Sequence, residues 1–255
     1  LMFLFGNCND SNTGSSSFKW DFQFKKSYVY SYSQTITASH TANEKAEPTN
    51  TYVRLDGKLY VETEGQGDSA VVIMDNMEAV FSNDDRQDTI RQLQPPNNLQ
   101  VMYADGSCAI EETEFLIHML LPIPKNDIIQ EDTSTIPLEM PFNAGGTMLK
   151  VKGQNALKYE GEADLDGQTC VIMKGVIDIS DLTVPPEVPG KYRYVSNGEA
   201  TYYFDLENGY YLRADIRYKM EMESGQSFPE LKWPDISMKM VSDNVYQIRL
   251  VEIIH

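Results

Sequence analysis

The sequence is poor in the residues that carry most enzyme chemistry. Its 255 residues include three His, three Cys and two Trp. The histidines, His40, His118 and His255, stand far apart, and none has a catalytic motif beside it. The patterns GxSxG, HExxH, GxGxxG and the P-loop are absent, so hydrolase, zinc-protease and nucleotide-binding functions have no starting point. We therefore expect a protein that is not an enzyme and that holds neither a metal nor a cofactor.

Basic residues are also scarce. Lys and Arg number 21 against 38 Asp and Glu, which leaves a net charge of −17. Such a charge repels phosphate backbones and anionic lipid, so binding to nucleic acid or through a polybasic surface is excluded. No apolar run approaches the ~20 residues of a membrane-spanning helix.

The first residues are typical of an export signal. Leu1–Gly6 is apolar, Cys8 follows, and residues 9–17 read NDSNTGSSS, which offers nothing to a core. This arrangement resembles the end of a bacterial lipoprotein signal peptide, in which the cysteine carries the lipid and a polar tether follows. We expect an exported protein held to the membrane through Cys8. The alternative is an ordinary secretory signal with an incidental cysteine.

Cys108 and Cys170 remain as a candidate pair. An oxidising compartment would permit a disulfide between them. Two buried free thiols are the alternative, because cysteine packs as a small hydrophobe. No CxxC pattern or Cys/His cluster is present in the sequence, which argues against a structural zinc site.

Most of the chain has the pattern of antiparallel sheet. From Leu212 to Glu223, apolar side chains alternate without a break against charged ones. Period two with one charged face indicates a strand that is buried on one side and wet on the other. A strand of twelve residues is long against the usual five or six, and it must twist and coil.

Turn dipeptides separate the alternating segments. Ala200–Leu206 precedes Asn208-Gly209, the strongest hairpin signal in the sequence. The same signal predicts turns at Asp56-Gly57, Asp105-Gly106, Asp166-Gly167 and Asn197-Gly198, and a further turn is predicted at Ser242-Asp243-Asn244.

Evidence for helices is limited to two segments. Asn83 or Asp84 has the residue type of a cap for a helix over Asp85–Leu93, which Pro95-Pro96 would end. Glu111–Leu121 has an acidic start that suits a helix, while its dense apolar end also suits a buried strand.

These patterns predict a mainly β fold: a long, strongly curved antiparallel meander, forming an open or incomplete barrel with one or two short helices. A sheet face that is apolar over many strands needs a cover, and a curved sheet closing on a helix provides one. We divide the chain into a signal remnant and tether (1–17), an N-terminal β half (18–121), a Pro/Gly-rich crossover (122–146) and a C-terminal meander (147–255).

The C-terminal half resembles an uncharacterised family of bacterial lipoprotein-like envelope domains. The likeness rests on LLPIP, on ALKYEGEADLDGQTCVIMKGVIDIS and on GEATYYFDLENGYYLRADIRYKMEME, about 130 residues in all. Where the family has Gly-Asp-x-Trp after the Leu-Pro segment, this chain reads KNDIIQEDTST. In architecture, the expected sheet is also similar to the lipoprotein carriers and lipid-binding lipoproteins of bacterial envelopes, which implies a curved sheet around an apolar cavity.

Three sets of residues are candidates for a site. Flexible thioethers suit varied apolar ligands, and we expect an apolar ligand face made by Met220, Met222, Met238 and Met240 with Ile216 and Tyr218. Core packing is the alternative for the same residues. Exposed Tyr rows, Tyr28/Tyr30/Tyr32 and Tyr202/Tyr203/Phe204, would stack a sugar or peptide, although we favour aromatic pairing within the sheet as their explanation. Glu111/Glu112 and Glu160/Glu162 are the acidic pairs that a hydrolase would use.

The sequence as a whole favours a non-enzymatic binding or structural module of the bacterial envelope, periplasmic or anchored to the outer membrane. Its expected partners are the membrane, through Cys8, and an apolar small molecule or lipid. A sugar- or peptide-binding surface protein is the second hypothesis, and an acidic-pair hydrolase is the third.

Overall fold

The computed structural model describes residues 18–42, 46–65, 67–84, 86–95, 97–126, 128–129, 133–144, 147–188, 190–226 and 236–255. These residues form one eleven-stranded sheet and one helix, α1 (Glu111–Leu120). The strands are β1 (Ser27–Thr41), β2 (Thr49–Thr63), β3 (Ser69–Asn83), β4 (Arg86–Gln94), β5 (Asn97–Tyr103), β6 (Ser134–Ala144), β7 (Thr147–Leu165), β8 (Gln168–Leu182), β9 (Lys191–Asp205), β10 (Tyr210–Gln226) and β11 (Ile236–Ile254).

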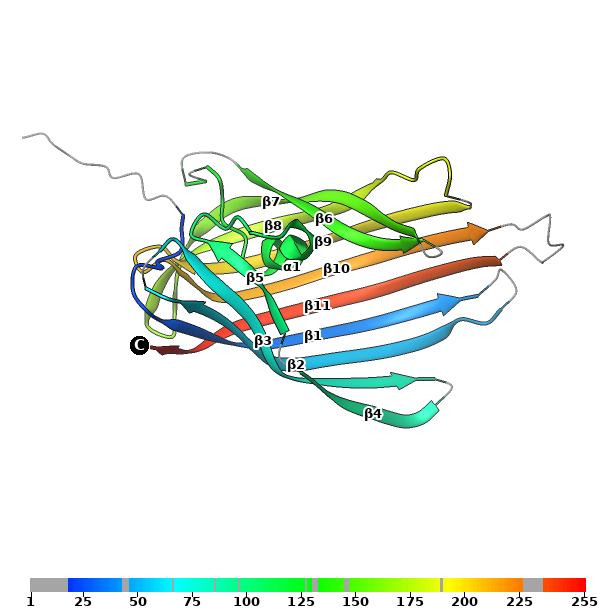
Figure 1. Ribbon diagram of the computed structural model, residues 1–255, viewed down its shortest axis with the longest axis horizontal. Helices are drawn as coiled ribbons and strands as arrows, with labels where there is room; N and C mark the ends of the chain where they lie inside the picture. The colour runs from blue at the N-terminus through cyan, green and yellow to red at the C-terminus, as the bar shows by residue number, and fades with distance from the viewer. Residues whose placement is uncertain are drawn as a thin grey trace, which may run out of the picture.

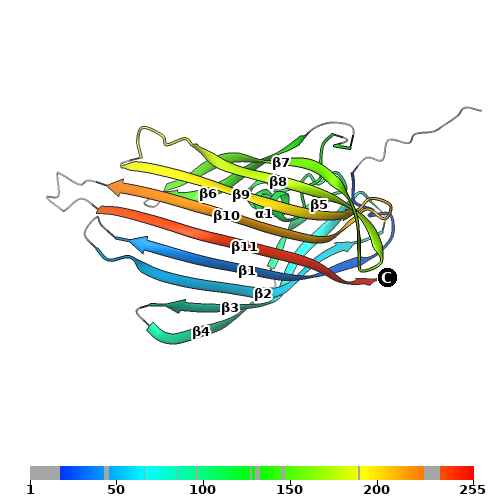
Figure 2. The ribbon, with the colours of Figure 1, turned by 180° about the vertical axis from the view of Figure 1, so that it is seen from behind.

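The sheet is antiparallel throughout, and its strand order is β4-β3-β2-β1-β11-β10-β9-β8-β7-β6, with β5 paired to the free edge of β3. The first and last long strands, β1 and β11, lie side by side at its centre. Within the described residues β6 pairs only with β7 and β4 only with β3, so the sheet stays open. It curls strongly along its length (Figures 1 and 2). The predicted open, curved meander is confirmed.

The alternation of apolar and charged side chains explains why the strands are long. In β10, the even-numbered side chains from Ala214 to Met222 face inward, while charged partners such as Arg217 and Lys219 face solvent. Its neighbour β11 continues the same two faces across the sheet, with Ile216 opposite Tyr246 and Met222 opposite Met240. One wet and one dry surface thus extend across β10 and β11.

Helix α1 lies against the concave face, in front of β9 and β10 in Figure 1. Ile117, Met119 and Leu120 bury its apolar side. The N–H of Leu121 closes the last turn on the carbonyl of Ile117, and Pro122 then ends the helix because it has no N–H to continue the ladder. The helical interpretation of this segment is confirmed.

Aromatic side chains close one end of the curved sheet under α1. The segment that precedes β1 places Phe18, Trp20 and Phe22 in the core. The Trp20 ring contacts Tyr28 and Tyr211, at centroid distances of 5.7 Å in both cases. The Tyr211 hydroxyl donates to the carbonyl of Pro122, which ties the sheet to the segment after α1.

The helix predicted over Asp85–Leu93 is wrong. Residues 86–94 form β4, which pairs with the far half of β3, for instance Val80 with Arg91. Only Ile90 and Leu93 are apolar, so a helix here would have too narrow an apolar face to pack on the core. The free edge of β3 instead offers backbone hydrogen bonds along the segment. Asp84 belongs to the β3–β4 connection, where its carboxylate accepts from the Asn50 amide.

The turn signals divide into two groups. Asn208-Gly209, Asp166-Gly167 and Asp105-Gly106 are turns, and each glycine has a positive φ. The turns predicted at Asp56-Gly57, Asn197-Gly198 and Ser242-Asp243-Asn244 are wrong, since these residues lie inside β2, β9 and β11. At Gly57 the β2–β3 register shifts, and at Gly198 the β10 backbone at Arg217 and Tyr218 occupies the space that a side chain would need.

The expected divisions at 121 and 146 do not interrupt the sheet, because β6 begins at Ser134 inside the crossover range and β1 of the first half pairs with β11 of the second. The described residues contain no helix long and apolar enough to span a membrane.

Candidate functional site

The inward face of the four central strands carries no Lys, Arg, Asp or Glu. This holds for every inward position described from Tyr28 to His40 on β1, from Tyr192 to Phe204 on β9, from Ala214 to Ser224 on β10 and from Met238 to Ile248 on β11. His40 is the only titratable nitrogen among them. In a chain that is 23% charged, this makes the concave face a low-charge surface suited to uncharged groups.

The inward face changes character along the strands. Near the helix it is packed and closed, and Ile216 and Tyr218 are buried there. Beyond the helix lie Met220, Met222, Met238 and Met240, which we call the methionine face. Their exposure varies: Met222 is buried, Met220 and Met240 are half-buried, and Met238 is 38% exposed. No described helix lies in front of this half of the sheet, whereas β6 lies in front of β9 (Figure 1), and Phe142 of β6 packs on Tyr194 of β9.

The methionine face continues onto neighbouring strands. Met140 and Tyr192 are half-buried beside it, and Phe142 packs edge-on against Tyr192 and Tyr194, with centroids 6.3 and 6.0 Å apart. A cavity of about 530 Å³ opens at the same strand ends, lined by Met238, Tyr192 and Ser224 together with four charged residues. Those four are Lys191, Arg193, Glu223 and Lys239. The charged side chains alternate with the apolar ones along these strands, and Lys239 pairs with Glu223 on the outer side.

A belt of hydrogen-bonded side chains separates the closed half from the methionine face. We call Tyr32, Gln34, Tyr218 and Tyr246 the tyrosine belt. The Tyr32 hydroxyl donates to Gln34 Oε1 at 2.8 Å, and Gln34 Nε2 donates to the Tyr246 hydroxyl at 2.8 Å. The hydroxyls of Tyr218 and Tyr246 lie 3.2 Å apart on stacked rings.

The belt has one hydroxyl hydrogen to spare. The contact between Tyr218 and Tyr246 uses one phenolic hydrogen, whichever ring donates, because each hydroxyl has a single hydrogen. The hydrogen bonds of the described residues give the second hydrogen no acceptor. The belt therefore presents one O–H donor that a ligand acceptor would satisfy.

The belt residues are neutral at physiological pH. Burial raises the pKa of Tyr32, of Tyr218 and of Tyr246 above its usual range, and the neighbouring Tyr218 phenol adds to the effect on Tyr246. A neutral phenol keeps its hydrogen and remains a donor.

The exposed Tyr rows predicted as a stacking platform are wrong. Tyr28, Tyr30, Tyr32 and Tyr202 are buried, as is Phe204, because α1 and the segment 18–24 cover that part of the sheet. Their rings pair with one another and with the core, so they cannot stack on an external sugar or peptide.

Of the two acidic pairs, the structure describes the side chains of one. Glu160 and Glu162 lie on the solvent face of β7, and Glu160 faces Lys174 at 3.5 Å. Glu111 and Glu112 belong to the first turn of α1, and their side chains lie outside what the structure describes.

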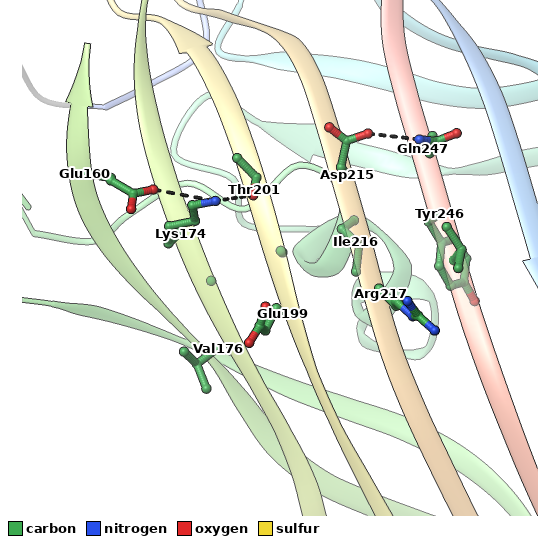
Figure 3. Close-up of a pocket in the computed structure, with 13 residues that line it drawn as sticks. Glu160, Lys174, Val176, Glu199, Thr201, Asp215, Ile216, Arg217, Tyr246 and Gln247 are labelled. Atoms are coloured by element: carbon green, nitrogen blue, oxygen red, sulfur yellow. Dashed lines mark hydrogen bonds and ion pairs between the residues drawn. The ribbon is translucent and has the colours of Figure 1, made fainter. Parts of the chain in front are cut away.

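The convex face has a shallow depression of about 480 Å³ over β8–β11. Figure 3 shows it from the side away from α1. Lys174 Nζ donates to Thr201 Oγ1 at 2.9 Å and pairs with Glu160, while Gln247 Nε2 donates to Asp215 at 3.1 Å. These polar groups satisfy one another, as is typical of a solvated sheet surface.

A larger cavity, of about 930 Å³, lies at the closed end between α1, the turn at Asp105-Gly106 and the segment after the helix. His118 reaches it from α1 and is buried. Its Nε2 lies 3.2 Å from Glu114 Oε1 and 3.2 Å from the Gly106 carbonyl, and its Nδ1 lies 3.2 Å from the Pro137 carbonyl. Sequence reasoning missed this cluster. The signal was Glu-x-x-x-His, an i,i+4 pair on one helix face.

Cys108 lies beside this cluster and Cys170 lies elsewhere. Both thiols are free, so the disulfide considered for them is not formed in the structure. The Cys170 thiol faces the Ala163 carbonyl at 3.5 Å. Burial, with Glu114 and Asp105 nearby, raises the pKa of the Cys108 thiol to about 12. The proposed lipid attachment at Cys8 lies outside the described residues.

The fold and this face together define an open, curved antiparallel sheet, closed at one end by a helix and apolar on its concave side. No family model and no curated protein matches the chain. Among solved structures the chain is similar to lipovitellin, in a structure concerned with lipid–protein interactions, at 13% identity and a TM-score of 0.44. The match covers 91% of this chain and 26% of that one, so this chain spans about a quarter of the lipovitellin chain.

Two bacterial structures also match. One is a DUF1329 family protein from Desulfovibrio piger, at 11% identity and a TM-score of 0.16, covering 89% of this chain and 85% of that one. The other is an outer membrane lipoprotein-sorting protein domain from Vibrio parahaemolyticus, at 6% identity and a TM-score of 0.14, covering 88% and 84%. At these values the likenesses assign neither a family nor a function to this chain.

Proposed function

We propose that this chain is a non-enzymatic binding module that holds an apolar molecule with an uncharged head. The apolar part lies on the methionine face, and the head points toward the tyrosine belt. The observation that carries the proposal is the charge-free inward face of β1, β9, β10 and β11, which ends in half-exposed methionines. Methionine suits this role because its flexible, polarisable side chain adapts to ligands of varied shape.

The tyrosine belt supports the choice of an uncharged head. A charged head at this depth would lose its hydration without gaining a counter-ion, since the inward side chains around the belt are Tyr, Gln, Ser, Asn, Ile, Ala and Met, and His40 lies further along β1, opposite Met240. The spare phenolic hydrogen suits an ester, ketone or hydroxyl oxygen instead. The ligand class is therefore a neutral amphiphile.

Export and attachment through a lipid on Cys8 complete the proposal. An anchored binding module at a bacterial membrane would meet apolar molecules where they are released. The prediction is that radiolabelled fatty acid labels the full-length protein in cells and does not label a Cys8→Ser variant. Equal labelling of both variants, or none of either, would remove the anchor and leave the binding face untouched.

Binding is tested with N-phenyl-1-naphthylamine, an uncharged probe whose fluorescence rises in apolar surroundings. We expect saturable enhancement with one probe per chain. Met240→Lys places a charge on the methionine face and should weaken binding by at least about tenfold, which corresponds to ~1.4 kcal/mol. Met240 is half-buried, so circular dichroism is recorded on each variant.

The matched control is Val241→Lys, which adds the same charge one residue along β11 on the opposite face, across from Glu221. It should bind the probe like the unmodified protein. A second variant, Met238→Lys, lies where the side chain is already exposed and keeps the test valid if Met240→Lys unfolds. Equal binding by all variants, or no binding by the unmodified protein, would refute the proposal.

A further inference from the structure

The closed end of the molecule brings together three side chains that the proposed function does not use. Cys108 Sγ, a Glu114 carboxylate oxygen and a His118 ring nitrogen all lie within 4.8 Å of one another. Thiolate, carboxylate and imidazole are the ligands that proteins use for zinc. Glu114 and His118 line the cavity of about 930 Å³, so the cluster opens toward solvent on one side.

The hydrogen-bond pattern of His118 points to a cation at Nε2. Its Nδ1 faces the Pro137 carbonyl, an acceptor, so the ring hydrogen of neutral His118 belongs there. The lone pair of Nε2 then faces two further acceptors, the Gly106 carbonyl and the Glu114 carboxylate, both at 3.2 Å. Nε2 and these two oxygens would repel one another, because no hydrogen lies between them. A positive charge at Nε2 would turn this repulsion into attraction. A second proton or a metal ion supplies such a charge.

We propose that Cys108 Sγ, Glu114 and His118 Nε2 bind a zinc ion. The Nδ1–H bond to the Pro137 carbonyl is the arrangement that metal-binding histidines typically have, because it fixes the tautomer and aims the other nitrogen at the metal. A borderline-soft cation is favoured over Mg²⁺ or Ca²⁺, since one ligand is sulfur and another is nitrogen. Water in the cavity completes the tetrahedron.

The local fold holds the three ligands on rigid elements. Glu114 and His118 are one turn apart on α1, whose buried face fixes their direction. Cys108 follows the turn at Asp105-Gly106, is bridged to Met102 of β5, and has its thiol 3.9 Å from the Gly106 carbonyl. Zinc bonds of about 2.0–2.3 Å place tetrahedral ligand atoms about 3.3–3.8 Å apart. The nitrogen and oxygen already have about this separation, and the sulfur needs a shift of about 1 Å.

Binding converts the thiol into a zinc thiolate and releases one proton to solvent, so affinity should rise with pH. No oxidant or reductant takes part. The site is independent of the methionine face, and neither proposal depends on the other.

The test uses Co²⁺ as a spectroscopic substitute and Zn²⁺ as the competitor. We expect one Co²⁺ per chain, a thiolate-to-cobalt charge-transfer band in the near ultraviolet, and loss of the band when Zn²⁺ is added. Cys108→Ser should abolish the band, and His118→Gln should weaken zinc binding at least about 100-fold. Cys170→Ser and His40→Gln are matched controls that keep both signals.

Some outcomes would overturn the assignment. If a second proton alone completes the His118 contact, Co²⁺ gives no charge-transfer band and Zn²⁺ binds the unmodified protein no more tightly than His118→Gln. A band that persists in Cys108→Ser would place the metal elsewhere. Circular dichroism of each variant shows whether it is folded. If a variant misfolds, the addition of Co²⁺ to the unmodified protein still tests the proposal.

Discussion

At the scale of single residues, glycines determine how closely a neighbouring strand can approach in this sheet, because they have no side chain. Gly198 lies opposite Tyr218 in the β9–β10 register, and a Cβ built on it would lie 2.3 Å from the Tyr218 Cβ and 2.3 Å from the Arg217 carbonyl oxygen. The β9 backbone at Gly198 therefore lies closer to the β10 backbone at Arg217 and Tyr218 than a side chain at this position would allow.

Gly198→Ala should destabilise the fold. The added methyl group displaces backbone in a packed region, which typically costs about 1–3 kcal/mol. Urea unfolding followed by circular dichroism measures the change. Gly225→Ala is the matched control on the neighbouring strand β10, since its Cβ would meet nothing within 4 Å, and it should leave stability unchanged or slightly raised. Equal effects of the two substitutions would contradict the packing assigned to Tyr218.

Gly198 also marks the limit of what local sequence can predict. Asn197-Gly198 and Asn208-Gly209 carry the same turn signal, yet only the second is a turn. Gly198 instead lies inside β9, where its contacts are with Arg217 and Tyr218 of β10, about twenty positions away in the sequence. Likewise Ser242 and Asn244 suggest a turn by composition, but they lie on the inward face of β11, buried beside the tyrosine belt.

At the scale of elements, α1 is held to the sheet by hydrogen bonds from tyrosines. The Tyr202 hydroxyl of β9 donates to the Met119 carbonyl at 2.7 Å and accepts from Asn155 Nδ2 at 2.9 Å. Burial raises the pKa of Tyr202 above its usual range, so the hydroxyl stays protonated as this donor role requires. The bond satisfies a carbonyl in the last turn of the helix, where no N–H of the helix is available.

Tyr202→Phe should lower the free energy of unfolding by about 1–3 kcal/mol, because it leaves the Met119 carbonyl and the Asn155 amide buried without this partner. Chemical denaturation measures the change. Tyr203→Phe is the control: it removes the same atom one residue away, on the opposite, partly exposed face. A loss of stability as large in Tyr203→Phe would refute the role given to Tyr202.

The elements themselves differed in how predictable they were. Strands β1 and β10 and the second half of β9 follow from alternation alone, because period two specifies both the strand and its inward face. The first half of β9 was missed, because Asn197-Gly198 predicts a turn inside it. The helix α1 was ambiguous from residues 111–121 and β4 was mistaken for a helix, because short segments take their structure from the edge or face that receives them.

The methionine face could be predicted, since it needs only the phase of two strands. The Cys108 cluster could not, because it depends on where a turn, a helix and β6 meet.

At the scale of the whole molecule, one curved sheet separates a charged convex surface from a neutral concave one. Ion pairs such as Arg213–Asp215 and Lys239–Glu223 lie on the outer side, and tyrosines fill the inner side near the helix. Pairing of β1 with β11 joins the first and last strands, so both halves of the sequence contribute to the same inward face.

The buried tyrosines predict loss of stability in alkali. Burial raises the pKa of Tyr30 and of Tyr211 well above the ordinary value of about 10, which applies to the unfolded chain. Above pH ~10 the unfolded chain releases these protons and the folded chain keeps them, so the stability present below this pH falls as pH rises further. Tyrosinate absorbance and circular dichroism recorded together should show these residues ionising only as the strand signal is lost. Ionisation of all fifteen tyrosines near pH 10 with the strand signal intact would contradict the burial.

The central claim, a concave face that takes a neutral amphiphile, is tested most directly by two ligands that differ only in the head. Bound N-phenyl-1-naphthylamine is displaced by monooleoylglycerol and, separately, by oleate, which has the same chain and a carboxylate. We expect displacement by monooleoylglycerol at one molecule per chain, and displacement by oleate at least about tenfold weaker. Equal displacement by both, or preference for oleate, would contradict it.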